Sequence, residues 1–248
     1  MSKAVQAAAL LAEVRETGVA LTGFPAELVP EDRSEIYALQ DALIAALGPV
    51  GGWKIAAGSE AVPLCSPLLE GGYLVSGDRL SIADNRLTVV EVEVGFRFKS
   101  ALPPRSNPYD RDEVLAAIEG ALTAIEMVGI RFAPGVEVPR AVQMGDLQVN
   151  AAVVTGAVVA DWEGLDLGTL KVRADIGAAH YEVDTGTSTE AVIDALVWLA
   201  NEGALRQGGL KAGEVVITGA RINQPVGDAG DLVVASIEGL GEVRLMLA

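Results

Sequence analysis

The segment Leu87–Phe98 alternates strictly between two kinds of side chain. Apolar residues hold one set of alternate positions and mostly polar residues hold the other: Val90, Val92, Val94, Phe96 and Phe98 against Glu91, Glu93, Gly95 and Arg97. Because successive side chains of a strand point to opposite faces of a sheet, this period predicts a strand with one buried face. Glu91 and Glu93 would then share the other face, with their Cβ atoms about 6–7 Å apart.

The first half of the chain predicts both helices and strands. Apolar residues spaced three and four apart predict helices over Lys3–Thr17 and residues 31–47, the second ended by Gly48 and Pro49. Asp112 is typical of a helix N-cap, which predicts a further helix to about residue 123. An apolar strand is expected to follow over residues 124–132.

The last third of the chain predicts short strands separated by glycine-rich turns, with one helix over residues 189–206 among them. These strands are expected near residues 170–175, 181–184, 215–218, 232–237 and 243–247. Strands and helices do not alternate as βαβ units would, so the sequence predicts an α+β fold built on a curved antiparallel or mixed sheet. We expect a helical region over residues 1–50 and one structural unit over residues 51–248.

The charge balance excludes several classes of function. The chain has 18 Lys and Arg against 34 Asp and Glu, a formal net charge of −16, and so lacks the clustered basic residues that nucleic acids and anionic membranes require. A single His and a single Cys exclude a Cys/His zinc site, an iron–sulfur cluster and an intrachain disulfide framework. A metal would therefore need oxygen ligands, which suit Mg²⁺, Mn²⁺ and Ca²⁺.

No targeting or membrane segment is recognisable. The N-terminal residues lack a small-residue cleavage pattern, and the longest nearly apolar run, residues 151–160, is shorter than the roughly 18 residues that span a bilayer. We therefore expect a cytoplasmic protein without membrane contact.

Glu126 lies in a stretch, residues 122–130, whose other members are apolar, small or Thr. Its carboxylate should point into the interior, where an unpartnered charge costs several kcal/mol or becomes protonated. A divalent cation shared with Glu91 and Glu93 would stabilise all three carboxylates together. Two alternatives stay open: an exposed sheet face that carries Glu91 and Glu93, and an ion pair of Glu126 with a basic residue such as Arg131 or Lys54.

Lys54 follows Gly51, Gly52 and Trp53 in a segment with few charges. A half-buried ammonium group beside a metal-bound substrate could stabilise an enolate or donate a proton. The alternative is a surface lysine in a strand flanked by glycines.

Five motifs in register resemble the hydratase/decarboxylase branch of the fumarylacetoacetate hydrolase superfamily, which includes 2-keto-4-pentenoate hydratases and 4-oxalocrotonate decarboxylases. The resemblance covers the chain from about Glu35 to Ala248. The motifs are Tyr37-Ala38-Leu39-Gln40, Gly52-Trp53-Lys54-Ile55, Val90-Glu91-Val92-Glu93-Val94, Ala124-Ile125-Glu126 and Gly213-Glu214-Val215-Val216-Ile217-Thr218-Gly219-Ala220.

This resemblance implies a fumarylacetoacetate hydrolase-like sheet roll or sandwich with flanking helices. It also implies a set of site residues. Glu91, Glu93 and Glu126 would bind Mg²⁺ or Mn²⁺, Lys54 would be a catalytic and substrate-binding residue, Asp146 a second catalytic residue, and Thr218 and Gly219 substrate-binding residues.

The sequence departs from the family pattern at three positions. Leu64 stands where the family often has an Asp, and Ala191 where it often has a His. The Asn that commonly follows the active-site Asp is Leu147 here. These departures leave the proposed metal ligands intact but leave the general acid and base unidentified.

The reaction that the resemblance implies is hydration of an unsaturated 2-hydroxy or 2-oxo acid through a metal-chelated enolate. Such acids offer two adjacent oxygens to one cation, which polarises the carbonyl group. The alternatives are decarboxylation of a 4-oxalocrotonate-like 2-oxo diacid, acylpyruvate-type C–C hydrolysis, or a catalytically reduced partner subunit. We expect a homo-oligomer whose ligand is a small 2-oxo acid, with pairing to a sister enzyme as a further option.

Overall fold

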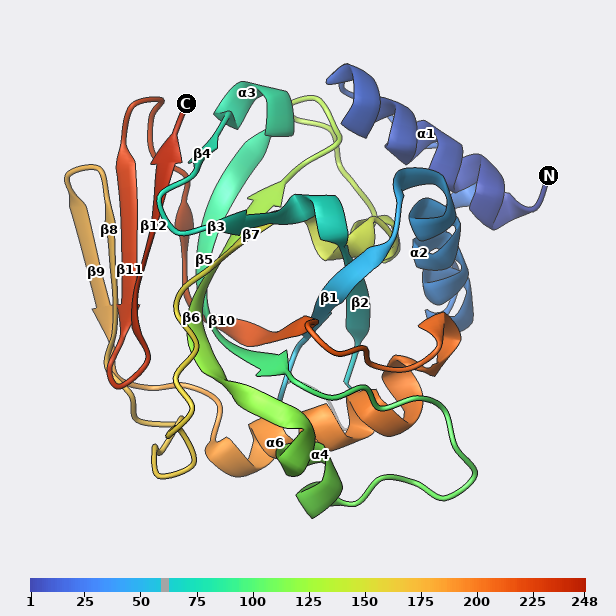
Figure 1. Cartoon of the computed structure of the whole chain (residues 1–248). Coiled ribbons are helices and arrows are strands. Elements are labelled where there is room, and N and C mark those ends of the chain that lie inside the picture. Colours follow the sequence, from blue (N-terminus) through green and yellow to red (C-terminus); the bar gives the residue numbers. More distant parts are fainter. Residues whose placement is uncertain (59–62) are drawn as a thin grey trace.

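The computed structural model describes residues 1–58 and 63–248 and contains two sheets (Figure 1). The larger sheet has the strand order β2-β1-β10-β5-β6-β7-β3 and the smaller one β4-β12-β11-β8-β9. The larger sheet comprises β1 (Val50–Ile55), β2 (Cys65–Leu69), β3 (Tyr73–Val75), β5 (Leu87–Phe98), β6 (Ile118–Gly129), β7 (Asn150–Thr155) and β10 (Val215–Pro225). The smaller sheet comprises β4 (Arg79–Leu80), β8 (Val172–Ile176), β9 (Ala179–Val183), β11 (Leu232–Ile237) and β12 (Gly241–Leu247).

Six α-helices lie around these sheets in the described part of the chain. They are α1 (Lys3–Thr17), α2 (Arg33–Leu47), α3 (Ile82–Asn85), α4 (Arg111–Ala117), α5 (Arg140–Gly145) and α6 (Thr189–Trp198). The expected α+β class, with mixed sheets and a small N-terminal helical region, is confirmed. None of the described helices is both long and apolar enough to cross a bilayer.

The larger sheet curls into a roll whose strands surround a common centre (Figure 1). The hydroxyl of Tyr73, on edge strand β3, donates a hydrogen bond to the carbonyl oxygen of Val215 on β10 at 3.0 Å. Gly52 on β1 makes room for this contact, because a Cβ there would overlap both atoms. A small apolar cluster fills the inside of the roll: Leu68, Leu122, Ala124, Val153, Val215 and Ile217.

The alternation of Leu87–Phe98 is confirmed in β5. Its apolar face, from Val90 to Phe98, is fully buried in the main core. Its acidic face points into the roll, since Glu93 pairs with Ala124, a member of the inner cluster. The pattern thus fixes which side of the sheet carries the carboxylates.

The two N-terminal helices pack on each other and contribute to the same main core as the sheets. α1 has the predicted bounds. α2 begins at Arg33 because the side chain of Asp32 accepts a hydrogen bond from the backbone N–H of Glu35, which caps the helix. A domain boundary at residue 50 stays a prediction.

A helix is present where Asp112 predicted one, but the predicted N-cap and the predicted end near residue 123 are wrong. Asp110 is the N-cap, it forms a capping box with Glu113, and α4 ends at Ala117. The chain continues as β6, which lies between β5 and β7 and is buried on both faces from Gly120 onward. Burial on two faces removes the period-2 pattern that would have identified the strand.

Replacement of Gly52 by alanine is expected to destabilise the protein by about 2–3 kcal/mol, because the added methyl group displaces the Tyr73 hydroxyl from Val215. Gly71→Ala is the matched control, since no heavy atom lies within 4 Å of its added Cβ. Urea unfolding of both variants measures the difference. Equal stabilities would show that the contact does not hold the roll closed.

Candidate active site

Three carboxylates converge inside the roll. Glu91 and Glu93 come from β5, and Glu126 comes from β6, where it pairs directly with Glu91. One oxygen from each carboxylate lies within 4.8 Å of the others. Glu93 and Glu126 are 1% and 0% exposed, whereas Glu91 is half-buried. The alternative that Glu91 and Glu93 belong to an exposed sheet face therefore does not describe Glu93.

Burial and mutual repulsion raise the free energy of the ionised carboxylates in this cluster. Burial raises the pKa of Glu91 to about 7, with Lys54 opposing the shift and Glu126 adding to it. Burial, followed by the Glu126 charge, raises the pKa of Glu93 well above its ordinary value. A proton or a cation is needed to stabilise the cluster.

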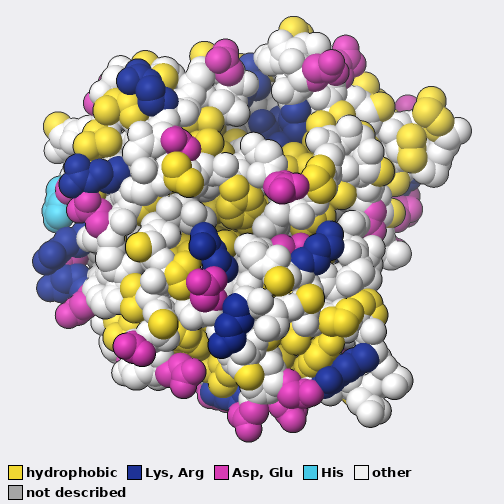
Figure 2. Space-filling model, in the orientation of Figure 1, with side chains coloured by type: hydrophobic (Ala, Val, Ile, Leu, Met, Phe, Trp, Pro, Cys, Tyr) yellow, Lys and Arg dark blue, Asp and Glu magenta, His cyan; other side chains and the backbone are white. Residues whose placement is uncertain are grey.

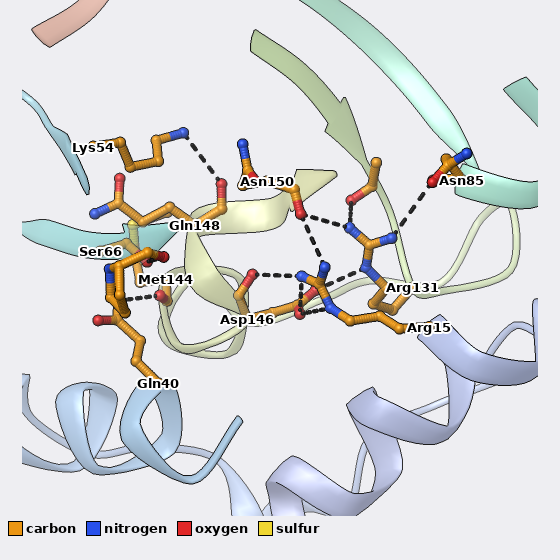
Figure 3. A network of polar contacts seen from close by, with 12 residues as sticks. Arg15, Gln40, Lys54, Ser66, Asn85, Arg131, Met144, Asp146, Gln148 and Asn150 are labelled. Atoms are coloured by element: carbon orange, nitrogen blue, oxygen red, sulfur yellow. Dashed lines mark hydrogen bonds and ion pairs between the residues drawn. The ribbon is translucent and has the colours of Figure 1, made fainter. Parts of the chain in front are cut away.

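Lys54 supplies one positive charge. Its Nζ donates to both oxygens of Glu126, at 2.6 and 2.7 Å, and lies 3.5 Å from the carbonyl oxygen of Gln148 (Figure 3 shows the latter contact). Burial alone would lower the pKa of Lys54, but the carboxylates of Glu126, Glu93 and Glu91 outweigh it and raise the pKa. The Glu126–Lys54 ion pair considered from the sequence is therefore present. Among the described residues, neither Glu91 nor Glu93 has a cation within ion-pair distance.

The donor set fits a hard divalent cation. Mg²⁺ binds oxygen at 2.0–2.1 Å and Ca²⁺ at 2.3–2.6 Å, so two ligands on opposite sides of the ion lie about 4–5 Å apart. The three carboxylate oxygens lie within 4.8 Å of one another, so all of them can reach one such cation. Glu126 has about four acceptor positions, of which Lys54 takes two and Asn150 takes one, so one remains for a cation.

Asn150, at the start of β7, holds Glu126 from the other side. Its Nδ2 donates to Glu126 Oε1 at 2.9 Å. Its carbonyl oxygen accepts from Arg15 Nη1 at 3.1 Å and Arg131 Nη2 at 3.2 Å (Figure 3). The position of one carboxylate in the cluster thus depends on two arginines from distant parts of the chain.

Asp146 joins these two arginines. It is 1% exposed and accepts from Arg15 Nη2 at 2.8 Å and Arg131 Nε at 3.2 Å. The structure therefore places Asp146 behind Asn150, where it can position Glu126 through the arginines. Its predicted role as a catalytic residue stays a prediction.

Thr218 and Gly219 lie at an irregularity of β10, where the pairing with β5 shifts register between Ile217 and Ala220. The N–H of Gly219 turns inward and donates to Glu93 Oε2 at 2.6 Å. Its φ of 112° favours glycine. Thr218 is buried and donates to the carbonyl oxygen of Val94 at 2.9 Å. The substrate-binding roles of both residues stay predictions.

A small cavity of about 190 Å³ opens onto the cluster. It is lined by Lys54, Ile55, Ala56, Glu91, Glu93, Gln148, Gly219 and Ala220. Sequence reasoning missed Gln148, Asn150 and Asn223, whose amide donates to Glu91. Of these three residues, Asn150 has a signal in the sequence, since its polar amide directly precedes the apolar residues 151–154.

A larger apolar hollow of about 710 Å³ lies next along the same face of β5 and β6. Its floor includes the paired residues Val89 and Val128, each two positions from Glu91 or Glu126. Arg86 also lines the hollow, but its guanidinium donates to the carbonyl oxygens of Ile130, Phe132 and Gly18. In the space-filling view, apolar surface is interspersed with acidic and basic side chains (Figure 2).

Known proteins resemble this chain in sequence and in fold. No family model matches it. It is 28% identical over 158 residues to 2-keto-4-pentenoate hydratase of Paraburkholderia xenovorans (strain LB400) and to 2-keto-4-pentenoate hydratase 3 of Pseudomonas putida. Each match covers 62% of this chain but only 57% of the relative's length.

Solved structures share the fold over nearly the whole chain. The 4-oxalocrotonate decarboxylase from Pseudomonas putida G7 superposes with a TM-score of 0.80 in its complex with magnesium and adipate, and 0.81 in its complex with calcium and acetate. These matches cover 99% of this chain and 97% of the decarboxylase at 18% and 19% identity. A putative fumarylacetoacetate hydrolase family protein from Yersinia pestis CO92 has a TM-score of 0.58 at 18% identity, over 81% of this chain and 93% of that one.

The chain thus has a fumarylacetoacetate hydrolase-like fold, and the acidic cluster inside it is a candidate divalent-cation site. The comparisons confirm the resemblance to the hydratase/decarboxylase branch that the sequence motifs indicated.

Binding of Mg²⁺ or Mn²⁺ is expected to strengthen as the pH rises through about 7. A proton on Glu91 competes with the cation, and its pKa of about 7 means that the carboxyl is mostly protonated at pH 6 and mostly ionised at pH 8. Calorimetric titrations at the two pH values should differ about tenfold in affinity, with tighter binding at pH 8. Equal affinities would remove Glu91 from the set of ligands.

Asn150→Ala is expected to weaken Mg²⁺ binding about 10–100-fold, because Glu126 loses the donor that orients it. Asn107→Ala, at an exposed loop position, should leave the affinity unchanged. Calorimetry gives both values, and circular dichroism confirms that the variants are folded. An unchanged affinity in Asn150→Ala would mean that this amide does not position the carboxylate.

Proposed function

We propose that the protein is a divalent-metal-dependent hydratase of an unsaturated 2-hydroxy or 2-oxo acid, similar to 2-hydroxypentadienoate. The observation that carries the proposal is the convergence of Glu91, Glu93 and Glu126 beside a single ammonium group, Lys54, in a small cavity. The names of the curated relatives, both 2-keto-4-pentenoate hydratases, support it.

In this proposal the three carboxylates hold Mg²⁺ or Mn²⁺ and Lys54 serves the substrate. A bound divalent cation would supply Lewis acidity toward the carboxylate and carbonyl oxygens of the acid. Lys54 Nζ places a positive charge where an anionic substrate meets a site that is otherwise acidic. The same ammonium group carries a proton that it can donate to the substrate.

The apolar hollow beside the cluster favours hydration over decarboxylation of a diacid. A 4-oxalocrotonate-like substrate has a second carboxylate, which needs a cation or several donors at its far end. Among the described residues that line the hollow, Arg86 has the one cationic side chain, and its guanidinium already donates to backbone carbonyl groups. A substrate with a short uncharged tail suits this surface better.

Lys54→Met is expected to lower kcat/KM for hydration of 2-hydroxypenta-2,4-dienoate at least about 100-fold, because the site loses its ammonium group. Lys99→Met, at an exposed position, should retain full activity. The assay follows the loss of dienoate absorbance with Mg²⁺, and circular dichroism verifies folding. Full activity in Lys54→Met would remove this residue from the mechanism, and full activity of the unmodified protein in EDTA would end the metal proposal.

The same assay separates the other reactions. Consumption of 4-oxalocrotonate but not of the dienoate would identify a decarboxylase, and cleavage of an acylpyruvate would identify a C–C hydrolase. If neither chromophore is lost with Mg²⁺, a catalytically reduced partner subunit becomes the better interpretation.

A further inference from the structure

Three consecutive residues between α5 and β7 adopt left-handed backbone conformations. Leu147, Gln148 and Val149 have φ angles of 51°, 51° and 55°. This region is unfavourable for side chains with a Cβ, and a run of three non-glycine residues persists only where the surroundings determine it. Here the N–H of Val149 donates to the carbonyl oxygen of Asp146 at 2.8 Å, and the residues on either side of the turn are fixed by the arginine network.

The turn directs Gln148 into the candidate active site. Gln148 is 8% exposed and lines the cavity together with Lys54, Glu91 and Glu93. Its side chain lies beside Lys54, away from the Asp146 network (Figure 3). The left-handed conformation therefore places an uncharged amide among the charged groups of the site.

The amide nitrogen of Gln148 has no hydrogen-bond partner. Its Nε2 is fully buried and makes no hydrogen bond in the structure. Buried polar groups in proteins are almost always paired, and an unpaired one is a reason to look for a ligand. The nearby carboxylates bond to other donors, since Glu126 accepts from Lys54 and Asn150, and Glu93 accepts from Gly219.

We propose that Gln148 Nε2 binds an oxygen of the 2-oxo acid head of the substrate, on the side of the cavity next to Lys54. The proposal rests on the function proposed above for the class of ligand. An anionic or carbonyl oxygen there accepts from the amide without adding charge to the acidic site. Gln148 is then a residue that selects acids with an oxygen-rich head, because a ligand without that oxygen leaves the buried amide unpaired.

The test measures ligand binding separately from catalysis. 2-Oxopentanoate, a saturated 2-oxo acid, is titrated into the Mn²⁺-loaded protein, and Mn²⁺ alone is titrated into the metal-free protein. Gln148→Met keeps the length of the side chain without its donor, and it should weaken 2-oxopentanoate binding at least about tenfold while changing Mn²⁺ affinity less than twofold. Gln6→Met, at an exposed position of α1, should change neither value.

Gln148→Asn tests the same idea in a residue type that adopts left-handed backbone readily. Its amide is one methylene group shorter, so 2-oxopentanoate binding should again weaken while circular dichroism and Mn²⁺ affinity stay unchanged. Unchanged 2-oxopentanoate affinity in either folded variant would overturn the role of Gln148 alone. If the unmodified protein fails to bind 2-oxopentanoate, the proposed function fails as well.

Discussion

The gathering of three carboxylates, two of them fully buried, on the inner face of a curled sheet is the constraint on which this structure depends. Each carboxylate taken out of water costs several kcal/mol unless a cation, a proton or hydrogen-bond donors offset the loss. The roll brings such groups from other strands of the same sheet: Lys54 from β1, Asn150 from β7, and Gly219 and Asn223 from β10. These contacts satisfy individual oxygens but leave the cluster with excess negative charge, which a divalent cation would neutralise.

The support of the cluster reaches the N-terminal helices. Arg15 on α1 contacts both Asp146 and the carbonyl oxygen of Asn150, and Asn150 in turn contacts Glu126. The left-handed turn carrying Gln148 lies between Asp146 and Asn150 in the chain. Residues 146–150 therefore connect the ion-pair network of the interior with the wall of the cavity. A substitution in the network should alter the position of the cavity wall, and a substitution in the wall should alter the network.

Patterns with a clear period gave correct predictions, and contacts between distant segments did not follow from the sequence. The alternation of β5 predicted the shared face of Glu91 and Glu93, and the apolar surroundings of Glu126 predicted its burial. The predicted helix runs into the first residues of β6, because the two buried faces of this strand carry no alternation. The role of Gln148 could not be predicted, because a left-handed turn of three residues without glycine has no sequence pattern. The ion pair of Asp146 with Arg15 could not be predicted either, because the two residues are 131 positions apart.

The direct pairing of Glu91 with Glu126 also limits how this protein could diverge. The register of β5 and β6 is regular from Val89 to Arg97, with irregularities only at its ends. After the insertion or deletion of one residue within that span, every side chain beyond it would point to the opposite face of the sheet. Acidic side chains would then enter the apolar core. Evolutionary change in length should therefore be confined to connections such as the one between β5 and α4, while the paired strands change only by substitution.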